Sequence, residues 1–158
     1  MRRTGGHVLY VAGHDPRIKA VVSQVPGTGP APDKSGFAAP APLVQKLASA
    51  MARGEIDALP RPKEQPESLK GTGDFRTMWR YLPRVAAANI RVPTLIIDQE
   101  QEEYGGRENS GLAAKNAIPR TTIVKYHVFP GSHYDIYEKN YREATKMARD
   151  WFSEHLKP

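Results

Sequence analysis

Residues 91–98 limit most strongly what this chain can fold into. Their letters, RVPTLIID, contain an unbroken apolar run that is entered from a proline. Such a run is typical of a parallel strand buried on both faces, because a half-buried strand alternates apolar and polar residues instead. Parallel strands need long crossover connections, usually helices. The segment therefore predicts an α/β protein.

The rest of the chain supplies strands and helices in alternation. β-branched stretches at residues 18–25 and 121–129 predict two more strands. Helices are expected at residues 5–12, 110–117 and 137–156, and this order predicts a parallel sheet of about three strands with flanking helices and right-handed crossovers. The last helix shows one continuous apolar face, formed by Tyr141, Ala144, Met147, Ala148, Trp151, Phe152 and Leu156.

A proline-rich stretch, residues 27–90, separates the first strand from the second. Most of the 14 prolines fall there, around two short helical patterns at residues 43–53 and 75–88. Pro83 is expected to kink or break the second of these. The stretch is too polar and interrupted to supply sheet core, so we interpret it as a cap-like insertion in a single domain, residues 1–158. A loosely ordered excursion is the alternative.

Composition excludes several classes of function. The chain has no cysteine, which rules out disulfides, a thiolate nucleophile and Cys-ligated zinc. The formal charge of +6 comes from scattered lysines and arginines, which predicts a solvated basic surface and no nucleic-acid partner. No apolar window reaches the roughly 18 residues of a membrane helix, and no export signal is evident. We expect a cytoplasmic protein without a membrane partner.

Two loops, after the second and third expected strands, carry residues suited to hydrolysis. Ligands of open parallel sheets bind at the carboxyl ends of the strands. One loop places His133 in the turn 130–134, where it could shuttle a proton, and a neighbouring carboxylate could fix its tautomer. A solvated turn histidine is the alternative. The carboxylates offered by the other loop are Asp98, Glu100, Glu102 and Glu103.

The same acidic loop could hold a hard cation. Asp98, Glu100, Glu102 and Glu103 are oxygen donors of the kind that Ca²⁺ prefers, and such an ion could polarise a lactone carbonyl. The loop lacks the EF-hand pattern, and a solvated acidic loop is the more frequent reading. A calcium site is therefore an additional expectation, beside a site that works without a metal.

Three parts of the sequence together resemble dienelactone-hydrolase-like α/β-hydrolases. Residues 5–26 resemble the helix after the nucleophile elbow and the next strand, and residues 92–97 resemble the strand before the catalytic acid. Residues 131–137, GSHYDIY, resemble the histidine turn. The resemblance implies an α/β-hydrolase fold of which the chain matches only the C-terminal part.

The resemblance also implies roles for single residues. His133 matches the catalytic base, and Glu102 matches the triad acid, with Asp98 and Glu103 as close substitutes. The family's nucleophilic serine falls at Arg2, which cannot attack an acyl carbon, and the next small residue is Thr4. The strands that would flank the first strand are not matched, and the open edge predicts pairing with another copy of the chain.

The sequence thus predicts an esterase or lactonase whose nucleophile is not the usual serine. Thr4, Ser132 and Ser23 are the hydroxyl candidates, and a water molecule activated by His133 needs none of them. A small ester or lactone, such as an acyl-homoserine lactone, is the substrate class that the resemblance implies. The alternative is a non-catalytic truncated hydrolase that acts as a ligand-binding or interaction domain.

Overall fold

The computed structural model describes residues 4–28, 53, 81–102 and 106–156. The chain divides into two compact units, residues 1–31 with 82–158, and residues 32–81. All helices and strands reported below belong to the first unit. The expected helix at residues 43–53 and the first part of the one at 75–88 lie outside the described residues, apart from Arg53.

A sheet of three parallel strands forms the centre of the first unit. The strands are β1 (Val21–Gln24), β2 (Thr94–Gln101) and β3 (Val124–Ser132), in the order β1-β2-β3. This confirms the predicted α/β fold and its three-stranded parallel sheet.

The second and third strands run further than the sequence predicts. Asp98 pairs with Val128 and Gln99 pairs with Phe129, so pairing with β3 carries β2 past Ile97, the last residue of its apolar run, to Gln101. Asp98 therefore lies inside a strand, and its expected place in a loop was wrong. β3 likewise runs through the expected turn to Ser132.

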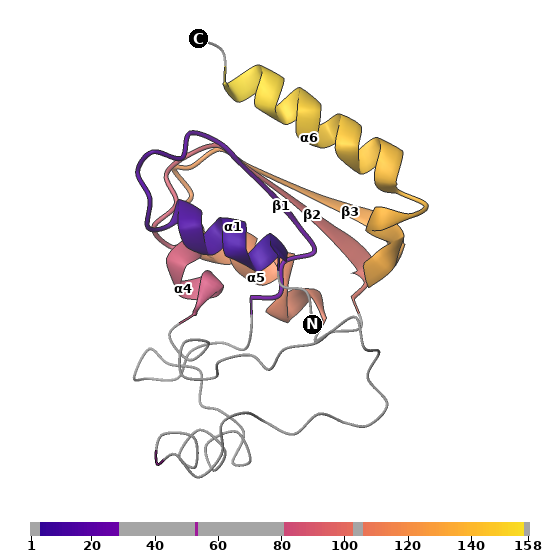
Figure 1. Ribbon diagram of the computed structural model, residues 1–158, viewed down its shortest axis with the longest axis horizontal. Coiled ribbons are helices and arrows are strands. Elements are labelled where there is room, and N and C mark those ends of the chain that lie inside the picture. The colour runs from indigo at the N-terminus through magenta and orange to yellow at the C-terminus, as the bar shows by residue number, and fades with distance from the viewer. Residues whose placement is uncertain (1–3, 29–52, 54–80, 103–105, 157–158) are drawn as a thin grey trace. The chain divides into compact units, whose positions relative to one another are not determined.

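Helices cover both faces of this sheet (Figure 1). On one face lie α1 (Thr4–Ala12), α4 (Pro83–Ala87) and α5 (Gly111–Ala117), and on the other lies α6 (Tyr141–His155). Two short 3₁₀ helices, η2 (Arg107–Asn109) and η3 (His133–Tyr137), follow the carboxyl ends of β2 and β3. The first unit thus has three layers, with the sheet between two layers of helices (Figure 1).

The alternation of side chains along β2 divides the core between these layers. Ile96 packs with Leu9, Ala87 and Ala114 from the three helices on its side. Leu95 and Ile97 point the other way and pack with residues of α6, chiefly Ala144 and Trp151. Full burial of an aliphatic side chain contributes about 1.5–3 kcal/mol, so a strand buried on both faces is a main source of stability.

Pro83 begins α4, and the expectation that it kinks or breaks a helix over residues 75–88 stays a prediction, because residues 75–80 lie outside the described part of the chain. Proline fits the first turn of a helix, where its missing N–H group has no intrahelical partner to lose. The helix brings Ala87 to the core, and Ile90 follows, both fully buried. The end of the proline-rich stretch thus supplies sheet core, contrary to the interpretation made from its polarity.

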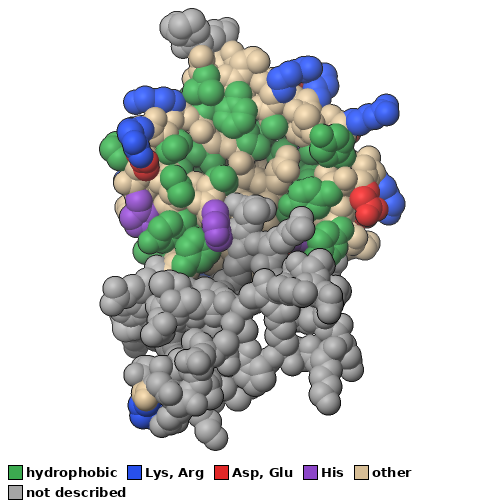
Figure 2. Space-filling view, in the orientation of Figure 1, with side chains coloured by type: hydrophobic (Ala, Val, Ile, Leu, Met, Phe, Trp, Pro, Cys, Tyr) green, Lys and Arg blue, Asp and Glu red, His purple; other side chains and the backbone are tan. Residues whose placement is uncertain are grey.

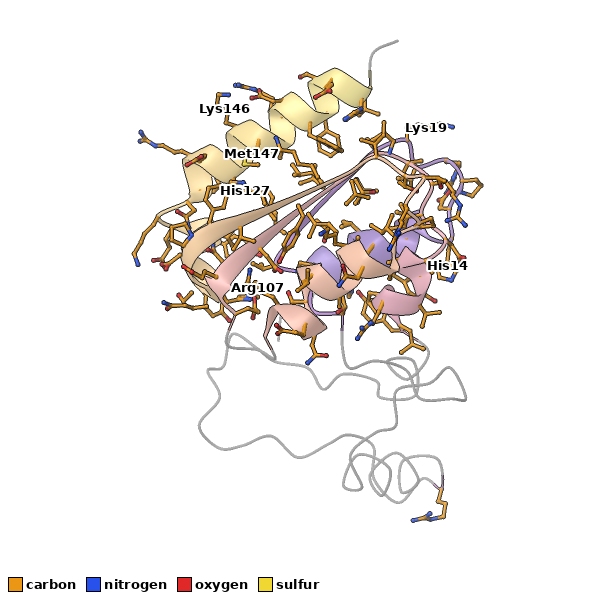
Figure 3. All side chains as sticks on the ribbon, turned by 180° about the vertical axis from the view of Figure 1, so that it is seen from behind. His14, Lys19, Arg107, His127, Lys146 and Met147 are labelled. Atoms are coloured by element: carbon orange, nitrogen blue, oxygen red, sulfur yellow. The ribbon has the colours of Figure 1, made fainter. Side chains whose placement is uncertain are left out.

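The apolar face of α6 is only partly buried. Ala144 and Trp151 are buried and Met147, which is labelled in Figure 3, packs against them, but Phe152 is 37% and Leu156 48% exposed. A three-stranded sheet is narrow, so it covers the inner part of the face alone.

The surface of the described residues shows basic, hydrophobic and neutral side chains together (Figure 2). On the side drawn in Figure 2, Lys and Arg side chains lie apart from one another, among hydrophobic and neutral groups. Within the described part of the chain, no helix is long and apolar enough to cross a membrane.

Candidate active site

A histidine and a glutamate meet at the carboxyl edge of the sheet. Glu102 follows β2 and His133 follows β3, and parallel neighbours bring these two strand ends together. The Nδ1 atom of His133 lies 2.7 Å from Oε2 of Glu102, with the two side chains 12% and 2% exposed. An ionised carboxylate can only accept a hydrogen bond, so the contact assigns the proton to Nδ1 and the basic lone pair to Nε2.

The local structure around His133 fixes the direction of its side chain. His133 begins η3, and Asp135 caps this helix by accepting a hydrogen bond from the backbone N–H of Ser132 at 2.9 Å. Lys139 forms an ion pair with Asp135 at 2.9 Å. The hydrogen bonds from Lys139 and from the Ser132 backbone lower the pKa of Asp135, so the cap remains charged. A capped helix start therefore holds His133, where the sequence predicted a simple turn.

Gly131 makes this entry to η3 possible. Its φ of 114° lies in the region that side-chain-bearing residues rarely adopt. A Cβ at this position would also overlap the carboxylate of Asp135. In the Gly-Ser-His sequence, the glycine is therefore required by the backbone conformation, and the histidine by the chemistry of the site.

The other candidate carboxylate, Asp98, has hydrogen-bond partners of its own in the core. It is fully buried and accepts hydrogen bonds from the hydroxyls of Ser110, at 3.0 Å, and Tyr126, at 2.9 Å. Burial raises the pKa of Asp98, while the two hydroxyl donors act in the opposite direction. The structure brings Glu102, and not Asp98, into hydrogen-bond contact with His133.

Three hydroxyl side chains were expected as possible nucleophiles, and the structure describes two of them, both in other roles. Ser23 is fully buried, and its Oγ donates to the backbone carbonyl of Gly5 at 2.8 Å, so its nomination as nucleophile was wrong. The Ser132 side chain takes part in the cap of η3. Thr4 is the first residue of α1, and its side chain lies outside the described residues.

The four carboxylates proposed as calcium ligands do not converge in the described part of the chain. Asp98 is buried, whereas Glu100 is exposed. Among the described residues, no group of three or more His, Cys, Asp or Glu could hold a metal ion. Glu103 lies outside them.

An open pocket of about 610 Å³ lies beside Glu102. Arg107, the first residue of η2, is labelled in Figure 3 near the ends of β2 and β3. The residues that line the pocket include charged side chains of both signs and are Glu100, Gln101, Glu102, Gly106, Arg107, Glu108 and Ser132.

The sequence did not predict two buried residues, Thr28 and Gln99, whose hydrogen bonds hold the segments next to this site. Thr28 donates through its hydroxyl to the carbonyl of Asn109 at 2.8 Å. The Gln99 amide, with its nitrogen toward Phe129 and its oxygen accepting from the Ile136 backbone at 2.7 Å, ties η3 to the sheet. Nothing in the sequence marks Thr28 as part of the site. Gln99 could have been noticed, because it is a polar residue at a buried position of β2.

Comparison with known proteins gives distant matches. No family model matches the chain. Two curated proteins of Escherichia coli, each described as an uncharacterized 31.7 kDa protein in the traX-finO intergenic region, are 25% identical over 178 aligned positions. The alignments cover 96% of this chain and 62% of each relative, so the chain spans less than two thirds of their length.

Solved structures match the fold more clearly. The α/β-hydrolase GrgF from Penicillium sp. gives a TM-score of 0.67 at 14% identity, over 96% of this chain and 60% of its own. A Paleococcus ferrophilus monoacylglycerol lipase gives 0.60 at 18% identity, over 94% and 65%. An esterase domain from Rhodothermus marinus gives 0.57 at 15% identity, over 97% and 58%. The chain therefore has the α/β-hydrolase fold.

Proposed function

We propose that the chain hydrolyses a carboxylic ester or lactone, with His133 as general base and Glu102 as the carboxylate that orients it. The single observation that carries this proposal is the 2.7 Å contact between His133 Nδ1 and Glu102 Oε2 at the carboxyl edge of a parallel sheet. A histidine whose Nδ1 is held by a buried carboxylate has its Nε2 ready to accept a proton. The likeness to solved lipases and esterases, which concerns the fold, is consistent with this chemistry.

In the reaction that we propose, water is the nucleophile. His133 Nε2 takes a proton from the water as its oxygen bonds to the acyl carbon, and the negative charge of Glu102 stabilises the imidazolium that forms. Collapse of the tetrahedral intermediate breaks the bond to the alkoxy oxygen, which receives the proton from His133. This route agrees with a Ser132 side chain that caps η3 and a Ser23 side chain that is buried.

The pocket beside Glu102 favours a small substrate. The polar groups among its lining residues can bind the carbonyl and alkoxy oxygens of a compact ester or lactone, and its volume of about 610 Å³ is in the range of small-molecule sites. An acyl-homoserine lactone remains our candidate among lactones. A bound cation such as Ca²⁺ would be an addition to this mechanism, and the water route does not depend on it.

The test is hydrolysis by purified protein of p-nitrophenyl acetate and of an N-acyl-homoserine lactone, with and without EDTA. We expect His133→Ala to lose the activity. His14→Ala is the matched control, because His14 is exposed after the far end of α1 and should leave the rate unchanged. Equal rates for wild type and His133→Ala would contradict the proposal, and a loss with EDTA would point to a metal-assisted form.

A second candidate function is ligand binding without turnover. It is favoured by one observation: the two serines expected as nucleophiles are used otherwise, Ser23 in a buried hydrogen bond to the Gly5 carbonyl and Ser132 in the cap of η3. Calorimetric binding of a lactone by a wild-type protein that does not hydrolyse it would favour this candidate.

We also propose that the chain self-associates through the outer edge of β1. Val21 and Val25 donate their N–H groups toward the β2 side, to Pro93 and Ile97, so the N–H of Val22 faces the opposite edge. Light scattering should show a dimer that Val22→Pro weakens, because proline removes this one donor and is tolerated on an edge strand. A wild type that is monomeric at high concentration would contradict it.

A further inference from the structure

A second carboxylate is buried behind the candidate site, and the reaction proposed above does not use it. Asp98 lies in β2, four residues before Glu102, with none of its surface exposed. An ionised side chain in the core lowers stability unless its hydrogen bonds and charge are well compensated. A carboxylate that is kept there, next to a candidate site, points to a functional reason.

Asp98 lies at the base of the loop that carries Glu102, and we call the described part of this loop, Glu102 and residues 106–110, the acid loop. Its Oδ1 accepts from the hydroxyl of Ser110, the residue at which the acid loop enters α5. Gly111 allows this approach, because a Cβ there would overlap the Asp98 carboxylate. The strand that leads into the loop is thus bonded directly to the residue that ends it.

The same carboxylate connects the loop to the strand that leads to His133. Its Oδ2 accepts from the hydroxyl of Tyr126 in β3, seven residues before His133 in the sequence. One buried group therefore joins β2, the N-terminus of α5 and β3 on one face of the sheet. Glu102 directly follows β2, and His133 directly follows β3.

Two further contacts restrain the acid loop. Thr28, which is nearly fully buried, donates through its hydroxyl and its backbone N–H to the carbonyl of Asn109, at 2.8 and 3.2 Å. Gly106 donates its N–H to the carbonyl of Glu102 at 3.0 Å. Asp98 and Thr28 thus fix the end of the acid loop at Asn109 and Ser110, and the bond from Gly106 ties the loop back to Glu102.

We propose that Asp98 is a positioning residue: by bonding Ser110 and Tyr126 together, it holds the acid loop so that Glu102 stays on Nδ1 of His133. Its catalytic consequence rests on the proposed function. The geometry that it predicts, the Glu102–His133 contact, can be measured without any substrate.

The first arm of the test measures that geometry. A long-range ¹H–¹⁵N spectrum reports which ring nitrogen of each histidine carries the proton, and His133→Ala assigns the His133 signals. We expect Nδ1 to be protonated in the wild type, as Glu102 requires, and the preference to be lost in Asp98→Asn. Ser110→Ala and Tyr126→Phe remove one donor each and should have smaller effects in the same direction; they also serve if Asp98→Asn fails to fold.

The second arm measures the rate. Asp98→Asn should lower kcat for the aryl ester about tenfold, with KM changed less than about twofold, because a misplaced orienting group affects the chemical step more than binding. Ile90→Val, a change in the core away from the acid loop, controls for lost stability and should keep both the tautomer and the rate.

Two outcomes are kept apart by this design. If His133 keeps its Nδ1 proton in Asp98→Asn and in both single-donor variants, the positioning role is overturned, whatever the rates are. If the wild type hydrolyses no ester, the proposed function fails, and the tautomer still decides whether Asp98 holds Glu102 in place.

Discussion

His133 and Glu102 are 31 residues apart in the sequence, and their side chains meet at 2.7 Å. The contact depends on the topology, because only neighbouring parallel strands bring two loops so distant in the chain to one edge. It also depends on burial: Glu102 is nearly inaccessible to water, so its charge acts on the imidazole with little screening.

Glu102→Gln is expected to lower kcat/KM by roughly 10²- to 10⁴-fold. The amide keeps the shape of the side chain, but it does not stabilise the imidazolium and can donate to Nδ1, which favours the wrong tautomer. Initial rates with p-nitrophenyl acetate measure the effect, with His14→Ala as the control that should match wild type. A Glu102→Gln enzyme within about threefold of wild type would mean that the contact has no part in turnover.

Ser132→Ala separates a capping serine from a nucleophilic one. Because the Ser132 side chain belongs to the cap of η3, we expect a loss of about 0.5–2 kcal/mol in the free energy of unfolding, measured with urea. The rate should fall much less than in His133→Ala. Ser153→Ala, on the exposed side of α6, controls for the substitution itself. Complete inactivation of a folded Ser132→Ala protein would instead favour a covalent acyl-serine route.

The sequence predicted the fold well because its signals are local. The apolar run of β2 and the helical periodicities follow from burial on a regular backbone, and they gave the three-stranded parallel sheet. Strand ends were less predictable. Asp98 and Gln99 are polar, and only pairing with Val128 and Phe129 shows that β2 continues through them.

The site was predictable in part, for a similar reason. The residues alone pointed to His133 and to a group of acidic side chains, and the resemblance to a known family favoured Glu102, with Asp98 and Glu103 as substitutes. Which carboxylate meets His133 depends on the side of β2 and its loop that each one faces. Ser23 shows the limit most clearly: whether a strand serine is accessible depends on the helix above it, here α1 through Gly5. Thr28, far from the acid loop in the sequence, could not be connected with it from local pattern at all.

Lowering the pH should increase the free energy of unfolding of the wild type relative to that of Asp98→Asn. Burial raises the pKa of Asp98 in the folded state, against the hydrogen bonds from Tyr126, Ser110 and the Gly111 backbone and with the support of the nearby Glu102 charge. A raised carboxyl pKa contributes stability below the unfolded-state pKa of about 3.9 and loses it as the pH rises through the folded value.

The measurement for this prediction is urea unfolding of both proteins at pH near 4 and near 7. The free energy of unfolding of wild type minus that of Asp98→Asn should be larger at the lower pH, since all other titrating groups are common to the two proteins. A difference that grows toward neutral pH would show that the pKa of Asp98 is lowered, and that its hydrogen bonds outweigh its burial.

Gly5→Ala should destabilise the fold although alanine favours helices. A Cβ at Gly5 would overlap the carbonyl of Gln24, so α1 must move away from β1 and stretch the hydrogen bond from Ser23 to the Gly5 carbonyl. Overpacking of this kind costs about 1–3 kcal/mol, more than the roughly 1 kcal/mol that alanine gains over glycine in a helix. Thermal unfolding should show a lower Tm for Gly5→Ala, whereas Val8→Ala, at an exposed position of the same helix, should stay near wild type. A higher Tm for Gly5→Ala would mean that α1 does not approach β1 as closely as the structure has it.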